Sequence, residues 1–153
     1  MNRILFVCTG NICRSPAAEA VCRNKLKEVG ILEKYEIDSA AIHAYHVGES
    51  PDYRTVNEGE RRGLNLAQIH ARQITLDDFY QYDLILGMTE EHLSFLKSKQ
   101  PADSAAKVDI LPNYVESENY KEIIDPYYGG EGHFSEMYDS LEEIMDKLVL
   151  KIT

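Results

Sequence analysis

Cys8 and Arg14 stand six residues apart near the start of the chain, separated by a short polar loop. The apolar run 4–7 before the loop predicts a buried strand, and the alanine-rich stretch after Pro16 predicts a helix. Backbone N–H groups and the positive end of a helix make such a loop a binding site for an oxyanion. The same field favours the thiolate of Cys8, which makes it a candidate nucleophile. The planar guanidinium of Arg14 can bind two oxygens of a phosphate held over the sulfur.

The rest of the loop fits the same kind of anion site. Gly10 allows a tight turn and a close approach of the backbone to the ligand. We expect Ser15 to cap the helix and Pro16 to occupy its first position. Ser15 can also donate to the Cys8 sulfur and make it a better leaving group. The loop residues expected to bind substrate are Thr9, Gly10, Asn11, Ile12, Cys13 and Ser15.

A structural alternative treats Cys8 and Cys13 as two small buried side chains in an ordinary strand–helix turn. It explains the flanking segments but leaves Arg14 and Gly10 as coincidences. The anion-site interpretation accounts for all four residues, so we favour it.

The chain resembles the low-molecular-weight protein tyrosine phosphatases over nearly its whole length. Residues 7–16 match the active-site loop of that family, and residues 125–128 match its acid loop, Asp-Pro-Tyr-Tyr. The resemblance implies a nucleophilic Cys8, a phosphate-binding Arg14 and Asp125 as general acid and base. It implies no cofactor and no metal, phosphotyrosine-containing proteins as partners, and binding of phosphate and oxyanion analogues such as vanadate.

Four apolar side chains are expected to wall the substrate cleft, and the resemblance supports this for Tyr45. The cleft would admit phosphotyrosine and other aryl phosphates, while phosphoserine would stop short of the sulfur. Related phosphatases that act on phosphoarginine carry Thr at the position of Ile12, so Ile12 favours phosphotyrosine. The expected walls are Ile12, Tyr45, Tyr127 and Tyr128.

In the family a Ser at the position of Ser39 helps to hold the Asn of the loop, here Asn11. A plain strand-end Ser is the alternative. Two positions depart from the family pattern. Ile69 stands where relatives carry a His, with His70 one place later, and Thr89 replaces an Asp that steadies the loop Arg. We therefore expect Arg14 to be oriented differently or less tightly in this chain.

Composition limits the remaining choices. A chain of 153 residues with a net charge of −10 is expected to form one domain, residues 1–153, that binds neither nucleic acid nor membranes. No apolar stretch reaches the roughly 20 residues of a membrane span. Three cysteines without a framework spacing fit free thiols in a reducing compartment, so we predict a cytoplasmic protein, and we expect a monomer.

Four strands alternate with helices along the chain, which predicts a small doubly wound four-stranded parallel sheet with helices on both faces. The resemblance implies the phosphotyrosine phosphatase I-like fold. Strands are predicted at 4–7, 35–42, 82–88 and 107–112. Helices are predicted from residue 16 to near Gly30, over 51–63 with Ser50 as cap, over 89–99 with Thr89 as cap, and over 134–151.

Three other functions fit the sequence less well. Thioredoxin-coupled arsenate reductases share the loop but need downstream cysteines, and none follows Cys22. A catalytically silent phosphotyrosine-binding module would not need Cys8, Arg14 and Asp125 together, and covalent trapping of phosphate distinguishes it. A metal site has little support, because the close pair at residues 43 and 46 lacks further ligands.

The remaining cysteines suggest redox regulation. A reversible disulfide between Cys13 and Cys8 would protect the nucleophile and make the enzyme redox-sensitive. An inert Cys13 is the alternative, and Cys22 is expected in the helix core.

Overall fold

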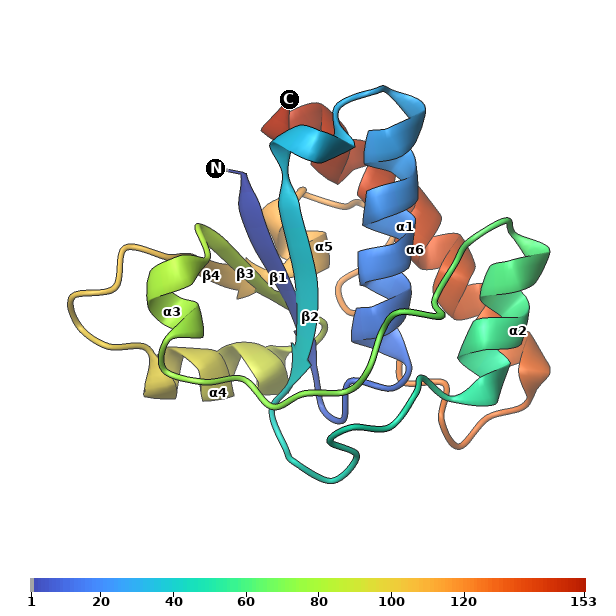
Figure 1. Ribbon diagram of the computed structural model, residues 1–153, viewed down its shortest axis with the longest axis horizontal. Coiled ribbons are helices and arrows are strands. Elements are labelled where there is room, and N and C mark those ends of the chain that lie inside the picture. Colours follow the sequence, from blue (N-terminus) through green and yellow to red (C-terminus); the bar gives the residue numbers. More distant parts are fainter. Residues whose placement is uncertain (1) are drawn as a thin grey trace.

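Four parallel strands form the centre of the molecule in the order β2-β1-β3-β4. A computed structural model describes residues 2–153. Figure 1 shows the strands running side by side, with their carboxyl ends at one edge of the sheet. The strands are β1 (Arg3–Cys8), β2 (Glu36–Ala41), β3 (Leu84–Gly87) and β4 (Lys107–Ile110).

Helices cover both faces of the sheet, as the sequence predicts (Figure 1). Long helices α1 and α6 lie on one face, and the shorter α3 and α4 lie on the other. The helices are α1 (Arg14–Glu28), α2 (Tyr53–Arg61), α3 (Asp78–Gln81), α4 (Glu90–Lys99), α5 (Leu111–Tyr114) and α6 (Glu131–Ile152), with a 3-10 turn at Leu32–Lys34.

The side chains of β1 explain the two-sided core. Ile4 and Phe6 pack in the cluster beneath α1 and α6, while Leu5 and Val7 pack in the cluster beneath α3 and α4. All four are fully buried, because successive side chains of a strand point to opposite faces and both faces are covered. The central strand therefore holds the Cys8 loop rigidly at the carboxyl edge of the sheet.

Helix starts differ from the prediction in two places. Helix α1 begins at Arg14 with Cys13 as its cap residue, so Ser15 does not cap it and Pro16 is third rather than first. Helix α2 is capped by Asp52, whose side chain accepts from Arg54 N, and not by Ser50. At α1 no side chain caps the helix, because the Ser15 hydroxyl lies against Cys8 Sγ, whereas at α2 the Asp52 side chain makes the cap hydrogen bond.

The predicted end of one strand and the predicted start of one helix were also wrong. Strand β4 ends at Ile110, and Pro112 lies inside the short helix α5, where its missing N–H costs nothing at the first turn. Helix α6 begins at Glu131, three residues before the predicted start. Thr89 caps α4 as predicted, accepting from the N–H of His92 at 3.4 Å.

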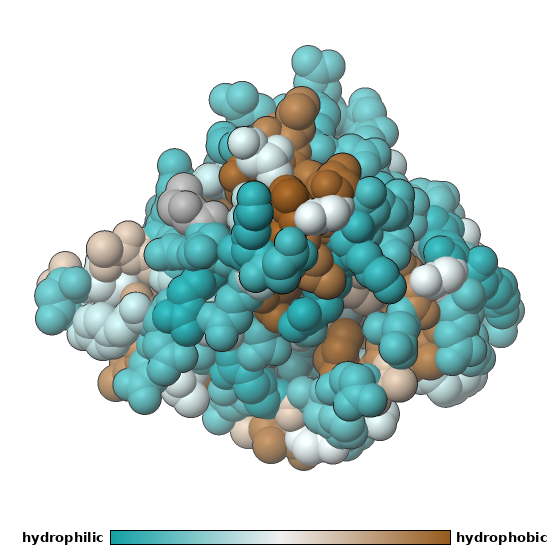
Figure 2. All heavy atoms as spheres, turned by 45° about the horizontal axis from the view of Figure 1, so that its top comes forward, coloured by the Kyte–Doolittle hydropathy of each residue, from teal (hydrophilic) through white to brown (hydrophobic). Residues whose placement is uncertain are grey.

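The amino ends of the strands lie at the opposite end of the sheet. Figure 2 shows this end, where the amino ends of the strands lie, as a largely hydrophilic surface around a smaller hydrophobic group. Among the helices of residues 2–153, none is long and apolar enough to span a membrane.

Candidate active site

Cys8 lies at the floor of a pocket of about 260 Å³ at the carboxyl edge of the sheet. It is the last residue of β1, and its side chain is almost fully buried, so only the pocket leads to its sulfur. The lining residues are Cys8, Thr9, Gly10, Ile12, Cys13, Arg14, Tyr45, His46, Asp125, Tyr127 and Tyr128.

The sulfur of Cys8 faces the start of α1. Ser15 Oγ lies 3.0 Å from Cys8 Sγ, and the backbone N–H of Ser15 donates to the same sulfur at 3.4 Å. Ser15 thus engages the cysteine instead of capping the helix. Donors directed at Sγ stabilise a thiolate more than a neutral thiol.

Asn11, and not Gly10, takes the left-handed conformation that closes the loop, with φ of 57°. Its side chain holds that conformation, because Nδ2 donates to Ser15 Oγ at 2.7 Å and to Ser39 Oγ at 3.0 Å. Gly10 lies close to His46 instead: a Cβ at residue 10 would lie 3.0 Å from the His46 ring, so the ring would have to shift.

Arg14 is oriented by three oxygens from distant parts of the chain. Nη1 donates to the carbonyl of Ile123 at 3.1 Å, and Nη2 donates to Thr9 Oγ1 at 3.3 Å. Asp125 Oδ2 lies 3.5 Å from Nη2. These contacts use only part of the five-donor fork, so N–H groups remain for the oxygens of a bound anion. The Arg14 side chain is nearly buried and lines the same pocket as Cys8.

His92 supports the opposite side of the loop from α4. The N–H of Met88 donates to His92 Nδ1 at 3.0 Å, so the ring proton must reside on Nε2, which lies 3.0 Å from Thr9 Oγ1. Thr9 therefore accepts from both His92 and Arg14, and its own hydroxyl proton is directed elsewhere. Burial, followed by the nearby Arg14 guanidinium, lowers the pKa of His92 to about 3. The imidazole is neutral at pH 7.

Asp125 lies on a loop held by its own backbone. Its Oδ1 accepts from the N–H of Tyr127 at 3.1 Å, and the N–H of Gly129 donates to Pro126 O at 2.9 Å. The guanidinium of Arg54 donates to Gly129 O at 3.3 Å and lies 5.5 Å from the centre of the Tyr127 ring. The second oxygen of Asp125 remains directed at Arg14 and the pocket.

A cysteine, an arginine and a carboxylate therefore face one small pocket that is lined with aromatic rings. A family model described as low molecular weight phosphotyrosine protein phosphatase matches residues 3–153. The chain belongs to this family.

Individual relatives agree with the family model. The low molecular weight phosphotyrosine protein phosphatase of Gallus gallus is 44% identical over 143 residues, 91% of this chain and 88% of the relative. A protein tyrosine phosphatase from Entamoeba histolytica superposes with a TM-score of 0.93 at 35% identity, covering 99% and 97% of the two chains. A Drosophila arginine phosphatase superposes with a TM-score of 0.91 at 28% identity, covering 100% and 98%.

The structure of this phosphatase-family chain brings the predicted cleft residues together. Tyr45 and Tyr128 are largely exposed at the rim, and Ile12 and Tyr127 are half-buried. The rings of Tyr127 and Tyr128 meet edge to face at 4.9 Å, while Tyr45 stacks on His43 at 4.9 Å. The rim is therefore aromatic, and the floor is polar.

The two departures from the family pattern have local explanations. Thr89 Oγ1 caps α4, and Arg14 is oriented by Ile123, Thr9 and Asp125. Ile69 packs at the edge of the core. The loop Asn11 receives a hydrogen bond from the backbone N–H of Arg72 at 3.1 Å, which needs no particular side chain.

Sequence reasoning missed three contributors to the site: His92, the carbonyl of Ile123 and His46. A polar side chain in the first turn of a helix that follows a neighbouring parallel strand was the available signal for His92. His46 Nδ1 lies 3.0 Å from Glu49 Oε2. Two polar residues three positions apart in a loop give no sequence signal for such a contact. A backbone carbonyl such as that of Ile123 leaves no signal in the sequence.

Cys13 and Cys22 are both buried. Cys22 is buried in the core, as predicted, and all three cysteines are free thiols. Burial raises the pKa of Cys13 to about 12, so it is protonated at neutral pH. Within residues 2–153, no group of three or more His, Cys, Asp or Glu is arranged to hold a metal ion.

Proposed function

We propose that this protein hydrolyses phosphotyrosine and aryl phosphate monoesters through a phosphocysteine formed on Cys8. The convergence of Cys8, Arg14 and Asp125 on one aromatic-rimmed pocket carries this proposal. The natural partners would be phosphotyrosine-containing proteins, and oxyanions such as vanadate would compete with them. A cytoplasmic location and a monomeric state stay predictions from the sequence.

In the first step the Cys8 thiolate attacks phosphorus, and a sulfur–phosphorus bond replaces the bond from phosphorus to the phenolic oxygen. Arg14 binds the equatorial oxygens, aided by the loop N–H groups and by the Thr9 hydroxyl, whose proton is free to donate. Asp125, on the side facing the pocket mouth, gives its proton to the departing phenolate.

In the second step a water molecule attacks the phosphorus of the phosphocysteine, and Asp125 takes one proton from it. The sulfur–phosphorus bond breaks, which releases inorganic phosphate and returns the thiolate. Hydrogen bonds from the side chain and the N–H of Ser15 stabilise the leaving sulfur, so they favour this step.

Depth is the proposed source of selectivity. A phenyl ring is long enough to carry its phosphate past Ile12 and the tyrosines to the floor, while a serine side chain is too short. The similarity to an arginine phosphatase makes phosphoarginine the second substrate to test, since its side chain is also long. Ile12 at the wall favours the flat aromatic ring.

The test is phosphate release from a phosphotyrosine peptide in EDTA by the wild type and by Cys8→Ser. Phosphoarginine and phosphoserine peptides of the same sequence serve as substrate controls. We expect metal-independent release from phosphotyrosine that disappears in Cys8→Ser. Turnover by a folded Cys8→Ser protein would refute the mechanism, and faster release from phosphoarginine would refute the substrate assignment.

A further inference from the structure

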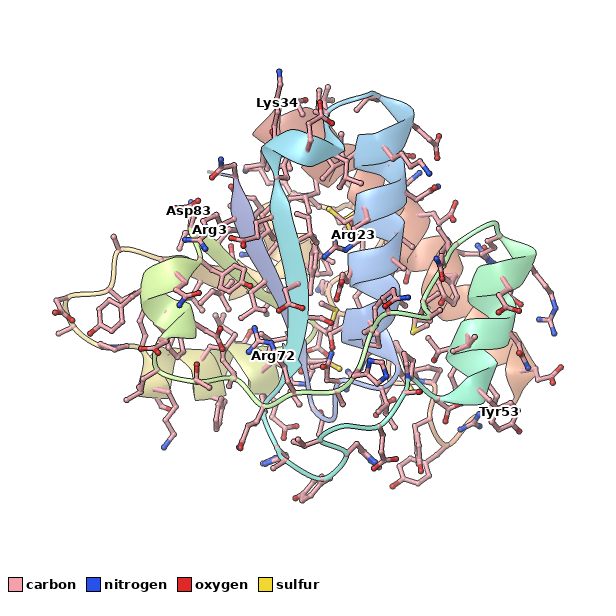
Figure 3. All side chains as sticks on the ribbon, in the orientation of Figure 1. Arg3, Arg23, Lys34, Tyr53, Arg72 and Asp83 are labelled. Atoms are coloured by element: carbon pink, nitrogen blue, oxygen red, sulfur yellow. The ribbon has the colours of Figure 1, made fainter. Side chains whose placement is uncertain are left out.

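The hydrogen bonds behind the catalytic loop do not end at Ser39. Its hydroxyl donates to Glu19 Oε1 at 2.7 Å, and Glu19 Oε2 accepts from Arg23 Nε at 2.9 Å. Arg23 also donates to the carbonyl of Ile37 on β2. Figure 3 shows Arg23 between α1 and β2. Glu19 is only 4% exposed, so a carboxylate is buried at the inner end of this network.

The direction of every bond in the network can be assigned. The backbone N–H of Arg72 can only donate, so Asn11 Oδ1 is the acceptor and Asn11 Nδ2 donates to both Ser39 and Ser15. Figure 3 shows Arg72 at the carboxyl end of β2. Ser15 already receives a hydrogen bond from Asn11, so its own proton is available for Cys8 Sγ. The sulfur is then the acceptor, as a thiolate is.

Glu19 keeps the proton of the Ser39 hydroxyl directed away from Asn11, so that Ser39 Oγ can accept the hydrogen bond from Asn11 Nδ2. Ser39 is buried, and the carboxylate is the acceptor that its proton meets. Without that acceptor the hydroxyl would turn toward Asn11 and compete with the Arg72 N–H for the amide oxygen. A rotated Asn11 amide would present its oxygen to Ser15 and draw the Ser15 proton away from Cys8.

Burying Glu19 carries a cost that ordinary packing would not require. Desolvation raises the pKa of Glu19, and the hydrogen bond from Ser39 and the charge of Arg23 only partly offset it, while Asp38 adds to it. Replacing a buried ion pair by apolar side chains of similar volume is often neutral or stabilising. The position therefore suggests a function other than stability.

We propose that Glu19 is a positioning residue that fixes the direction of the hydrogen bonds running through Ser39, Asn11 and Ser15 to Cys8. This inference rests on the proposed function, in which Cys8 is the nucleophile. Glu19 does not line the pocket that holds Cys8, so it acts on the sulfur through Ser39, Asn11 and Ser15.

The test compares wild type, Glu19→Met, Glu19→Gln and a control, Glu28→Ala. Met fills the volume without an acceptor, and Gln keeps one acceptor oxygen for Ser39 because the partly exposed Arg23 can turn to water. Glu28 is an exposed carboxylate on the same helix that bonds only Asn24 among its described side-chain partners. Folding of each variant is checked by circular dichroism, and Glu19→Ala replaces the Met variant if that one does not fold.

The measurement is the pH dependence of iodoacetate labelling of Cys8, located by fragmentation of the tryptic peptide, together with the acid limb of kcat/KM. The charged and titratable groups around the sulfur, Arg14, Asp125, Cys13 and His46, are the same in every variant. We expect Glu19→Met to raise the midpoint of the labelling curve and the midpoint of the acid limb by about one pH unit each. A shift of that size corresponds to the free energy of about one hydrogen bond to a charged group. Glu19→Gln and Glu28→Ala should stay near wild type.

The sign of the shift separates this proposal from simple electrostatics. Removing a negative charge near the sulfur would favour the thiolate and lower the midpoint, whereas losing the ordered network raises it. An unchanged or lowered midpoint in a folded Glu19→Met variant would overturn the proposal, as would a Glu19→Gln midpoint raised by the same amount. Failure of the wild type itself to release phosphate would instead reject the proposed function.

Discussion

Acid should destabilise this protein through His92, a residue that the fold holds in its neutral form. Its side chain is 1% exposed, Nδ1 accepts from the Met88 N–H, and its pKa falls from the usual 6.5 to about 3. A proton on Nδ1 would face the Met88 donor with no acceptor between them. Between pH 6.5 and 3 the unfolded state therefore binds more protons than the folded state, and stability falls as the pH falls.

The size of the effect follows from the two pKa values. Linkage with values of 6.5 and about 3 gives a loss of about 2 kcal/mol in the free energy of unfolding between pH 7 and pH 5. Glu19, whose pKa is raised, acts in the opposite direction. Its contribution is the same with and without His92, so it cancels in a comparison of variants.

The assay is urea unfolding of wild type, His92→Asn and His70→Asn at pH 7 and pH 5, with circular dichroism as the measured signal. An Asn oxygen can still accept from the Met88 N–H but does not titrate, so His92→Asn should lose about 2 kcal/mol less than wild type on acidification. His70 is exposed and should behave as wild type. Equal losses in wild type and His92→Asn would refute the reasoning.

Three further predictions concern the proposed chemistry. Arg14→Lys should lower kcat/KM for an aryl phosphate by roughly 100-fold or more, because one ammonium cannot bind Ile123 O, Thr9 and the phosphate together; a wild-type rate would contradict this. Asp125→Asn should lower kcat by on the order of 100-fold for phenyl phosphate and by much less for nitrophenyl phosphate, whose leaving group needs no proton. Equal losses on the two substrates would exclude Asp125 as the acid. Cys13→Ser should turn peroxide inactivation that dithiothreitol reverses into inactivation that it does not reverse, measured as recovered activity.

Much of the fold could be predicted because it depends on local pattern. A short apolar run such as 4–7 favours a buried strand, and the alternation of strands with helices leaves few topologies. Helix starts were less predictable, since Ser15 and Asp52 each had more than one possible partner, and the choice between a cap and another acceptor depends on neighbouring elements.

The candidate site also has a part that the local sequence determines and a part that depends on tertiary packing. The sequence by itself determined the strand–loop–helix that carries Cys8 and Arg14, because residues close in the chain share one backbone turn. The motif at residues 125–128 pointed to a partner, but only the tertiary structure brought Asp125 to 3.5 Å from Arg14.

Only the packing of separate elements decided how the site is held. The Ile123 carbonyl orients Arg14, the Met88 N–H selects the His92 tautomer, and the Arg72 N–H and Glu19 set the direction of the network behind the loop. Backbone groups leave no mark on a sequence pattern, and a buried carboxylate looks like any other helix residue until its neighbours are known. Hydrogen bonds across a core depend on which surfaces meet, and that is a property of the assembled fold.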